Sequence, residues 1–159
     1  HSADHAAEFA SWCRFHPEGT RGLNLGGRDA DYYGITPAEF TERANRQVFV
    51  GIQIETLGAL EQASEIAALK QVDMLFVGPA DLAMALGVVG QYHHEKLWDA
   101  IAAVSEACRQ HGKVWGCVAP DPEFSKKAIE LGCRLPTFGN EIHAMRRGIA
   151  NLRDLFDTK

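Results

Sequence analysis

A chain of 159 residues with 46% hydrophobic and 23% charged side chains has the composition of one globular domain with a sizeable core. This composition excludes disordered and collagen-like chains, which have too few apolar residues to form a core. The net charge of −5, with basic clusters no longer than the pair Arg146 and Arg147, excludes the basic surface that nucleic-acid binding requires.

The cysteines and the apolar runs indicate the cellular location of the protein. No C-x-x-C motif occurs, so we expect buried or free thiols in a reducing compartment. The four cysteines are Cys13, Cys108, Cys117 and Cys133. No apolar run approaches the roughly 20 residues that span a bilayer, and residues 1–15 show a mixed helical pattern instead of a charged and then apolar signal. These features predict a cytoplasmic protein without a membrane partner.

The N-terminal part of the chain is predicted to be helical. Helices are expected over about residues 3–14 and 37–46, joined by a glycine-rich loop. The segment Thr36-Pro37-Ala38-Glu39 has a capping-box pattern with proline at the first helical position, which marks the start of the second helix. The pair Gly26-Gly27 in the loop lacks the strand-to-helix context of a dinucleotide-binding loop.

From Val48 onward, four short apolar runs alternate with segments of helical spacing, a pattern typical of repeated βα units and a parallel sheet. The runs are residues 48–54, 73–78, 113–118 and 134–138. Asp121-Pro122 and Gly132 mark the start and end of the helix between the last two runs. Two helical segments carry apolar residues three and four positions apart, and each set is predicted to form one buried stripe. The sets are Leu97, Ile101, Val104 and Cys108, and Met145, Ile149, Leu152 and Phe156.

Two architectures fit four consecutive βα units. A doubly wound sheet of flavodoxin size agrees directly with the length of the chain. Half of a (β/α)₈ barrel, whose full length is about 250 residues, has the same local pattern. Length favours the first architecture, and periodicity alone leaves both open.

Carboxylates follow two consecutive runs at the points where the predicted strands end. Because side chains alternate along a strand, Gln53 and Glu55 lie on the face opposite Ile52 and Ile54. The next run ends in the same way with Asp81. The two carboxylates would converge at one edge of the sheet, where a hard cation such as Mg²⁺ or Mn²⁺ would hold both ionised. The structural alternatives are a helix cap for Asp81, and an arginine partner or a helix start for Glu55.

Two segments, GIQIET at residues 51–56 and LFVGPADLAMALG at 75–87, resemble the paired signatures of the HpcH/HpaI family of class II pyruvate-dependent aldolases. The resemblance extends from about Ala3 nearly to the C-terminus, through the segments FHPEGTRGLN, HGKVWGCVA and AIELGCRLPTFGNEIHAM. It implies an α/β fold of the (β/α)₈ TIM-barrel type. Residues 1–159 would then be the C-terminal part of one barrel domain, covering roughly strands 5 to 8 and their helices.

The resemblance also implies the roles of individual residues. Glu55 and Asp81 match the family's ligands for a divalent metal, Mg²⁺ or Mn²⁺, with Co²⁺ as a further candidate. Gln53 would lie near bound pyruvate, and the backbone N–H groups of Gly78-Pro79-Ala80 would receive the pyruvate carboxylate. The implied activity is the cleavage or formation of 4-hydroxy-2-oxo acids from pyruvate and an aldehyde through a pyruvate enolate. A homo-oligomer is also implied, with the C-terminal helix available for packing between subunits.

The family's first four strands have no counterpart in this sequence. They carry the histidine-carboxylate pair that moves protons and the arginine that holds pyruvate, so the catalytic acid and base are expected upstream. No histidine here lies in the catalytic motif, and six are predicted to be surface or capping residues: His5, His16, His93, His94, His111 and His143. Arg21 lies in a loop that could border the site, with a structural role as the alternative.

Two other functions stay open. A citrate-lyase-β-like lyase acting on an acyl-CoA would need a coenzyme A groove, for which the sequence shows no basic lining. A non-catalytic half-barrel could bind a metal or a 2-oxo acid, or assemble through open sheet edges. A catalytic base encoded upstream would favour the aldolase over the non-catalytic alternative.

Overall fold

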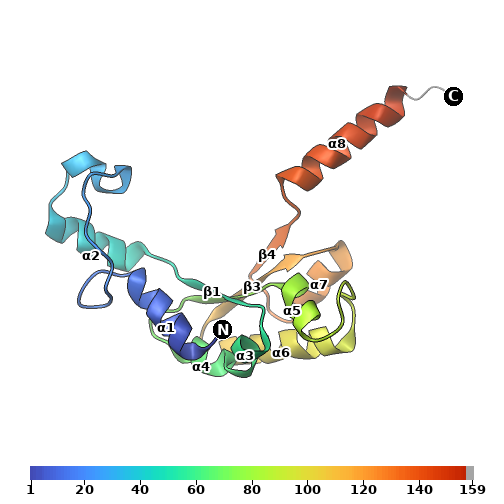
Figure 1. Cartoon of the computed structure of the whole chain (residues 1–159), viewed down its shortest axis with the longest axis horizontal. Coiled ribbons are helices and arrows are strands. Elements are labelled where there is room, and N and C mark those ends of the chain that lie inside the picture. Colours follow the sequence, from blue (N-terminus) through green and yellow to red (C-terminus); the bar gives the residue numbers. More distant parts are fainter. Residues whose placement is uncertain (157–159) are drawn as a thin grey trace.

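One four-stranded parallel sheet organises the computed structural model, which describes residues 1–156 (Figure 1). The strands lie side by side in chain order, and each neighbouring pair is parallel. They are β1 (Gly51–Ile54), β2 (Met74–Val77), β3 (Val114–Ala119) and β4 (Leu135–Phe138). The repeated βα units are therefore confirmed. A flavodoxin-like doubly wound sheet has the order 2-1-3-4-5, so the sequential order of this sheet argues against that alternative.

The helices begin where the sequence signals predict. Thr36 accepts a hydrogen bond from the backbone N–H of Glu39, and Asp121 accepts one from Phe124 at 2.8 Å. Gly132, with φ at 91°, follows the last of these helices in the left-handed region that favours glycine. The helical elements are α1 (Ala3–Trp12), the 3₁₀ helix η1 (Arg28–Tyr33), α2 (Pro37–Gln47), α3 (Leu57–Glu61), α4 (Ala63–Ala68), α5 (Pro79–Ala85), α6 (Glu95–Gln110), α7 (Pro122–Glu130) and α8 (Glu141–Phe156).

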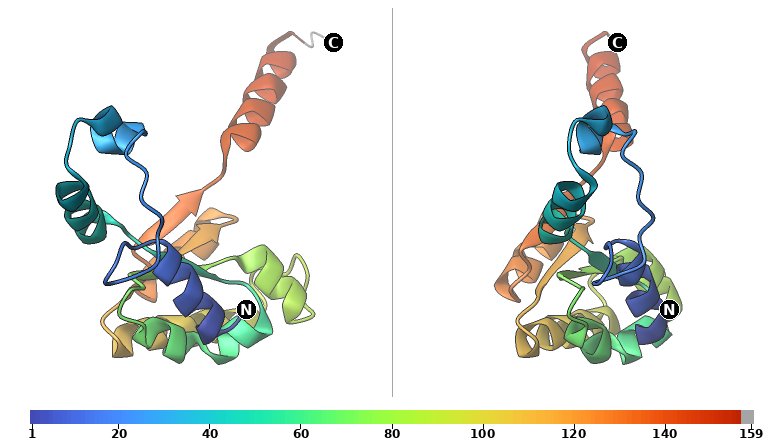
Figure 2. Two further views of the ribbon diagram at one scale, coloured as in Figure 1. Left: turned by 60° about the vertical axis from the view of Figure 1, so that its left-hand side comes forward. Right: turned by 90° about the vertical axis from the view of Figure 1, so that its left-hand side faces the viewer.

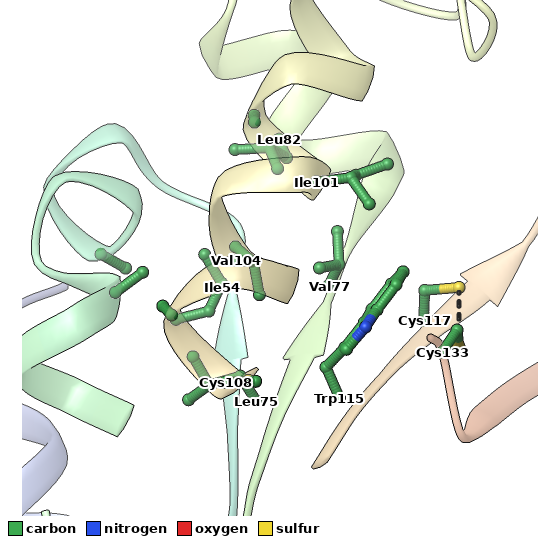
Figure 3. Packing of buried hydrophobic residues seen from close by; sticks show 14 of the residues in the cluster. Ile54, Leu75, Val77, Leu82, Ile101, Val104, Cys108, Trp115, Cys117 and Cys133 are labelled. Atoms are coloured by element: carbon green, nitrogen blue, oxygen red, sulfur yellow. Dashed lines mark hydrogen bonds between the residues drawn. The ribbon is translucent and has the colours of Figure 1, made fainter. Parts of the chain in front are cut away.

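The core lies between the sheet and a layer of helices on one of its faces. Helices α3, α4 and α6 run along this face in both figures of the whole chain (Figures 1 and 2). The strands contribute Ile54, Leu75 and Val77, all fully buried, and these meet the apolar stripe of α6 (Figure 3). The predicted stripe is confirmed, because each of its four side chains is at most 1% exposed: Leu97, Ile101, Val104 and Cys108.

The opposite face of the sheet has little cover within the described residues. Gln53 on β1 and Val118 on β3 are exposed, and Phe76 on β2 is only half-buried. Within residues 1–156, β1 and β4 are edge strands with one strand neighbour each. This uncovered face and these two edges are the surfaces that further strands of a barrel would need.

Helix α8 departs from the prediction. Its apolar stripe was expected to be buried, but Met145, Ile149, Leu152 and Phe156 are between 58% and 81% exposed, and no residue of α8 is buried. The reason is geometric: after β4 the chain extends away from the sheet, and α8 projects beyond the other elements (Figures 1 and 2). The spacing correctly predicts an apolar face, but within residues 1–156 nothing packs against it.

Arg21 has a structural position. Together with a small second core of Phe15, Ala30 and Phe40, it belongs to the lobe formed by the N-terminal loop and α2. Its guanidinium carbon lies 4.6 Å from the centroid of the Phe15 ring, and its Nη2 lies 3.4 Å from a carboxylate oxygen of Asp29. This cation–π contact and ion pair account for the charge, and the interpretation of Arg21 as a residue bordering the site is not supported.

The thiols are free, as predicted. Cys108, Cys117 and Cys133 are buried and Cys13 is half-buried. Burial raises the pKa of Cys108 to about 11, and burial together with the neighbouring Cys133 raises the pKa of Cys117 to about 12. The sulfur atoms of Cys117 and Cys133 lie 3.8 Å apart (Figure 3). In residues 1–156 no helix combines the length and the apolar character needed to cross a bilayer.

A pair of matched substitutions tests the contrast between α6 and α8. Ile101→Ala is expected to lower the free energy of unfolding by about 2–5 kcal/mol, because it deletes a fully buried side chain. Ile149→Ala should cost less than about 0.5 kcal/mol in the monomer, because its side chain is 60% exposed. Urea unfolding measures both, at a concentration where sedimentation shows a monomer. Equal destabilisation by the two variants would mean that α8 is packed in solution.

Candidate metal and substrate site

The predicted site residues of β1 and β2 lie at the carboxyl-terminal edge of the sheet. Gln53 is on β1, and Glu55 follows the strand directly. The parallel register pairs Ile54 with Val77, and the backbone N–H of Gly78 donates to the carbonyl of Ile54 at 3.2 Å. This register brings the segment after β2 beside Glu55, at the edge where α/β proteins of this kind carry their sites.

The Glu55 carboxylate is oriented by its neighbour on the same face of the strand. The Gln53 amide donates a hydrogen bond from Nε2 to Glu55 Oε2 at 2.6 Å. Within residues 1–156 Glu55 makes no ion pair with an arginine. The helix that follows is capped instead by Thr56, whose side chain accepts from the N–H of Ala59. Both structural alternatives for Glu55 are therefore wrong, and its half-buried carboxylate keeps free oxygen lone pairs.

Gly78 permits the close approach of these side chains. A Cβ atom at this position would lie 2.8 Å from Gln53 Nε2, 2.9 Å from Glu55 Oε2 and 3.3 Å from Glu55 Cβ. The first two separations are shorter than real Cβ contacts, so only glycine leaves the amide and the carboxylate where they are. From the sequence, only the backbone of Gly78 was predicted to take part in the site. The absence of a side chain at Gly78 matters as well, because the strand register places Gln53 and Glu55 against it.

Asp81 lies in the first turn of α5 and does not cap it. The helix begins at Pro79 with Gly78 as the N-cap, which makes Asp81 its third residue. The capping alternative is therefore wrong, and the exposed Asp81 side chain is available to a ligand. The first turn also leaves the N–H groups of Ala80 and Asp81 without acceptors inside the helix.

A small cavity of about 160 Å³ joins several of the predicted residues. Gln53 and Asp81 line it together with the segment Gly78-Pro79-Ala80. Three residues that sequence reasoning missed complete the lining: Tyr92, Val118 and Pro120. Val118 could have been found, because it lies at the end of the third run on the face that Gln53 shares. Tyr92 has no such signal, because it lies in a loop.

Glu55 lines a neighbouring cavity of about 290 Å³, and Gln53 contributes to both cavities. Glu55 and Asp81 thus lie in adjoining spaces that share the Gln53 side chain. His1 and His5, with stacked rings, also line the Glu55 cavity. Of the six histidines predicted to be surface or capping residues, His5 is therefore exposed but near a candidate ligand.

The donor set suits one kind of metal ion. Among residues 1–156, no group of three or more histidine, cysteine, aspartate or glutamate side chains could hold a metal. A closed structural zinc site needs four such ligands. Mg²⁺, by contrast, is commonly held by one or two carboxylates while water and substrate oxygens complete its octahedron. Glu55 and Asp81 fit this second mode.

Other histidines cap helices or connect loops. His94 is the N-cap of α6, where Nδ1 accepts from the N–H of Lys96, and His111 is the C-cap of the same helix. His93 contacts Asp121, with 2.9 Å between Nε2 and Oδ2. The backbone N–H of Phe124, with a smaller effect from His93, lowers the pKa of the Asp121 carboxyl.

A larger cavity of about 1090 Å³ lies between α7 and α8 and shares Val118 and Pro120 with the small cavity. Its lining is of mixed charge: it includes four basic or imidazole side chains, Lys126, His143, Arg146 and Arg147, and the carboxylates of Asp121 and Glu130. Basic side chains thus lie nearer to the site than the sequence indicated, beside two acidic ones. Sequence reasoning missed this lining because the four residues come from two helices that only the fold brings together.

The four parallel strands follow one another in chain order, and carboxylates lie beyond the ends of two adjacent strands. The chain is therefore an α/β protein with its candidate site at the carboxyl-terminal edge of a parallel sheet. Within that class, residues 1–147 match the family described as HpcH/HpaI aldolase/citrate lyase. The chain belongs to this family.

Similar proteins carry names of aldolases and lyases. The 5-keto-4-deoxy-D-glucarate aldolase of Klebsiella pneumoniae subsp. pneumoniae is 32% identical over 155 residues, which are 98% of this chain and 60% of that protein. The solved structure of an HpcH/HpaI aldolase from Desulfitobacterium hafniense DCB-2 matches with a TM-score of 0.87 and 27% identity, over 99% of this chain and 61% of that one. An HpcH/HpaI aldolase/citrate lyase family protein from Burkholderia cenocepacia has a TM-score of 0.84 and 33% identity, over 96% and 62%. The chain thus spans about three fifths of the length of these relatives.

Proposed function

We propose that this chain is the metal- and pyruvate-binding part of a class II pyruvate-dependent aldolase, a carbon–carbon lyase that cleaves or forms 4-hydroxy-2-oxo acids. One observation carries the proposal: Glu55 and Asp81 lie at the carboxyl ends of adjacent parallel strands, in adjoining cavities that share Gln53. The aldolase names of the relatives support the same reaction class.

Glu55 and Asp81 would hold a divalent ion, Mg²⁺ or Mn²⁺, with Co²⁺ as a further candidate. When bound, the ion would supply the positive charge that stabilises the enolate of pyruvate. The chain's own groups would orient the reactants. Gln53 restrains the Glu55 carboxylate through its hydrogen bond at 2.6 Å. In the segment Gly78-Pro79-Ala80, the N–H of Ala80 would donate to the carboxylate of pyruvate, since proline has no N–H and that of Gly78 donates to Ile54.

We further propose that residues 1–159 are the C-terminal part of one (β/α)₈ barrel domain and supply its strands 5 to 8. The sequential strand order and the uncovered face of the sheet support this arrangement. So does the greater length of the relatives. The acid and base that move protons, and an arginine that holds pyruvate, would then come from upstream residues.

The apolar face of α8 and the free thiols support two finer proposals. Ile149 and the rest of the exposed stripe on α8 would pack between subunits of a homo-oligomer, since an apolar helical face of this kind gains stability when covered. The four unpaired cysteines are compatible with a cytoplasmic location, where thiols stay reduced.

The substrate part of the proposal is tested with oxalate, which mimics the enolate of pyruvate. Oxalate and pyruvate should bind the chain when Mn²⁺ is present and should not bind in excess chelator, because the ion and the N–H groups of the first turn of α5 share the ligand. Titration calorimetry with and without chelator measures this dependence. Equal binding of oxalate under both conditions would contradict the two-point arrangement.

One observation favours a second candidate, the citrate-lyase-β-like lyase acting on an acyl-CoA. The cavity between α7 and α8, with Arg146 and Arg147 in its mixed-charge lining, adjoins the small cavity through Val118. A fluorescent coenzyme A analogue that binds the chain and is displaced by unlabelled coenzyme A would favour the acyl-CoA lyase. Absence of such binding, with binding of oxalate, would favour the aldolase. If neither ligand binds in the presence of metal, the remaining candidate is a non-catalytic half-barrel.

A further inference from the structure

Two buried thiols from separate elements lie in contact beside α7. Cys117 is the fourth residue of β3, and Cys133 lies in the turn between α7 and β4. Their sulfur atoms are 3.8 Å apart, and the two residues are 0% and 5% exposed (Figure 3). No other two thiols within residues 1–156 lie in such contact.

The backbones of both residues are held by hydrogen bonds. The N–H of Cys133 donates to the carbonyl of Ala128 at the end of α7, and the N–H of Arg134 donates to the carbonyl of Trp115 on β3, each at 2.9 Å. Cys117 lies in a strand with a neighbour on each side, β2 and β4. The fold therefore keeps the two sulfur atoms beside each other.

Their separation is close to that of two atoms about to react. Groups poised for reaction are about 3–3.5 Å apart, and a disulfide bond is about 2.05 Å long. The sulfur atoms must therefore approach each other by about 1.8 Å to form this bond. Rotation of the two side chains about their Cα–Cβ bonds moves the sulfur atoms on this scale, so a bond does not require the strand to move.

Burial affects the rate and the stability of such a disulfide in opposite directions. Burial, together with the neighbouring Cys133, raises the pKa of Cys117 to about 12. The reactive thiolate is therefore scarce, and large oxidants have no access to it. The same burial destabilises the thiolates of the reduced state, and a disulfide is harder to reduce when its reduced state is less stabilised. A disulfide here should form slowly, with a small oxidant, and persist once it has formed.

We propose that Cys117 and Cys133 are an oxidative modification site, at which hydrogen peroxide converts the two thiols into a disulfide that links the two ends of the α7 segment. Cys133 reacts first, because it is the more exposed: its sulfur attacks a peroxide oxygen, the O–O bond breaks, and a sulfenic acid and one water form. The sulfur of Cys117 then attacks that of Cys133, the S–O bond breaks, and the hydroxyl group leaves with the proton of Cys117 as a second water. The thiols lose two electrons in total, and the peroxide gains them.

The disulfide encloses the segment that the two adjoining cavities share. Val118 and Pro120 line both the small cavity and the larger one, and they lie with all of α7 between the two cysteines. Closing a loop of this length restricts the unfolded chain, so oxidation should raise the midpoint of urea unfolding by about 1 M. This effect is independent of the metal site and of the proposed activity.

Tryptic mapping tests the pairing, because trypsin cleaves between all four cysteines. Cys117 falls in the peptide of residues 114–126, and Cys133 in that of residues 128–134. After the folded chain is treated with hydrogen peroxide and its remaining thiols are blocked, mass spectrometry should find these two peptides joined. Dithiothreitol should separate them. The same treatment in urea should instead distribute the links over pairs that include Cys13 and Cys108.

Alanine variants connect the link to its effect on stability. Cys117→Ala and Cys133→Ala should each lose the joined peptides and the rise in the urea midpoint on oxidation. Cys108→Ala is the matched control, because it also removes a buried thiol, and it should keep both. Absence of the joined peptides from the folded parent, or links as mixed as those formed in urea, would overturn the proposal. A link without a rise in the midpoint would overturn its effect on the α7 segment. The mapping uses the parent chain, so it decides the question even if an alanine variant does not fold.

Discussion

Replacing Glu55 by glutamine is expected to abolish the binding of Mn²⁺ to this chain. The substitution keeps the size of the side chain but removes half of the negative charge that Glu55 and Asp81 together offer, and Asp81→Asn does the same from the other strand. Loss of an outer partner of a metal ligand commonly costs about 10- to 100-fold in affinity, so loss of a ligand itself should exceed about 100-fold. Titration calorimetry with Mn²⁺ measures the effect.

Two further variants make this experiment specific. Glu65→Gln removes an exposed carboxylate on α4 that makes no ion pair within residues 1–156, and it should bind Mn²⁺ like the parent. Gly78→Ala keeps both carboxylates but places a Cβ 2.9 Å from Glu55 Oε2, so it should weaken binding by displacing one ligand. If Glu55→Gln and Asp81→Asn both bind Mn²⁺ like the parent, the metal site is elsewhere.

Local signals predicted the parts of the fold that local interactions determine. Thr36 and Asp121 cap their helices because a side-chain oxygen satisfies an N–H three residues later, and this needs no other part of the chain. The stripe of α6 is equally clear, because its spacing agrees with its burial. The stripe of α8 has the same spacing and is exposed. Periodicity identifies the apolar face of a helix but does not identify what covers it.

Some residues of the candidate site could likewise be predicted from local sequence, and others could not. The positions of Glu55 and Asp81 near one edge were predictable, because parallel strands end at one edge. Glu55 directly follows one apolar run, and Asp81 follows the next run after Pro79 and Ala80. The steric role of Gly78 was not predictable, because it depends on the register that pairs Ile54 with Val77. Tyr92 lines the small cavity from a loop, and the next residue in that loop, His93, contacts the distant Asp121. Contacts of this kind between separate loops leave no periodic trace in a sequence.

The second large effect concerns catalysis by the chain on its own. Residues 1–159 alone are expected to release little or no pyruvate from a 4-hydroxy-2-oxo acid, even with Mn²⁺ bound. Cleavage needs a positioned base for the substrate hydroxyl, a contribution of typically about 10² to 10⁴ in rate. The histidines that cap α6 or contact Asp121 already make those contacts and are not positioned as this base.

The open edges of β1 and β4 should also make the isolated chain self-associate.

Activity should recover when the upstream half of the barrel is supplied, in the same chain or as a separate fragment, because it would bring the base and cover both edges of the sheet. Pyruvate release coupled to lactate dehydrogenase measures both states, and the same complemented protein carrying Glu55→Gln is the matched control without the metal ligand. Full turnover by the purified short chain would contradict the prediction that the base comes from the upstream half of the barrel. It would also identify the base among its own residues, with His5 as the first candidate because it lines the cavity beside Glu55, followed by His16 and His143.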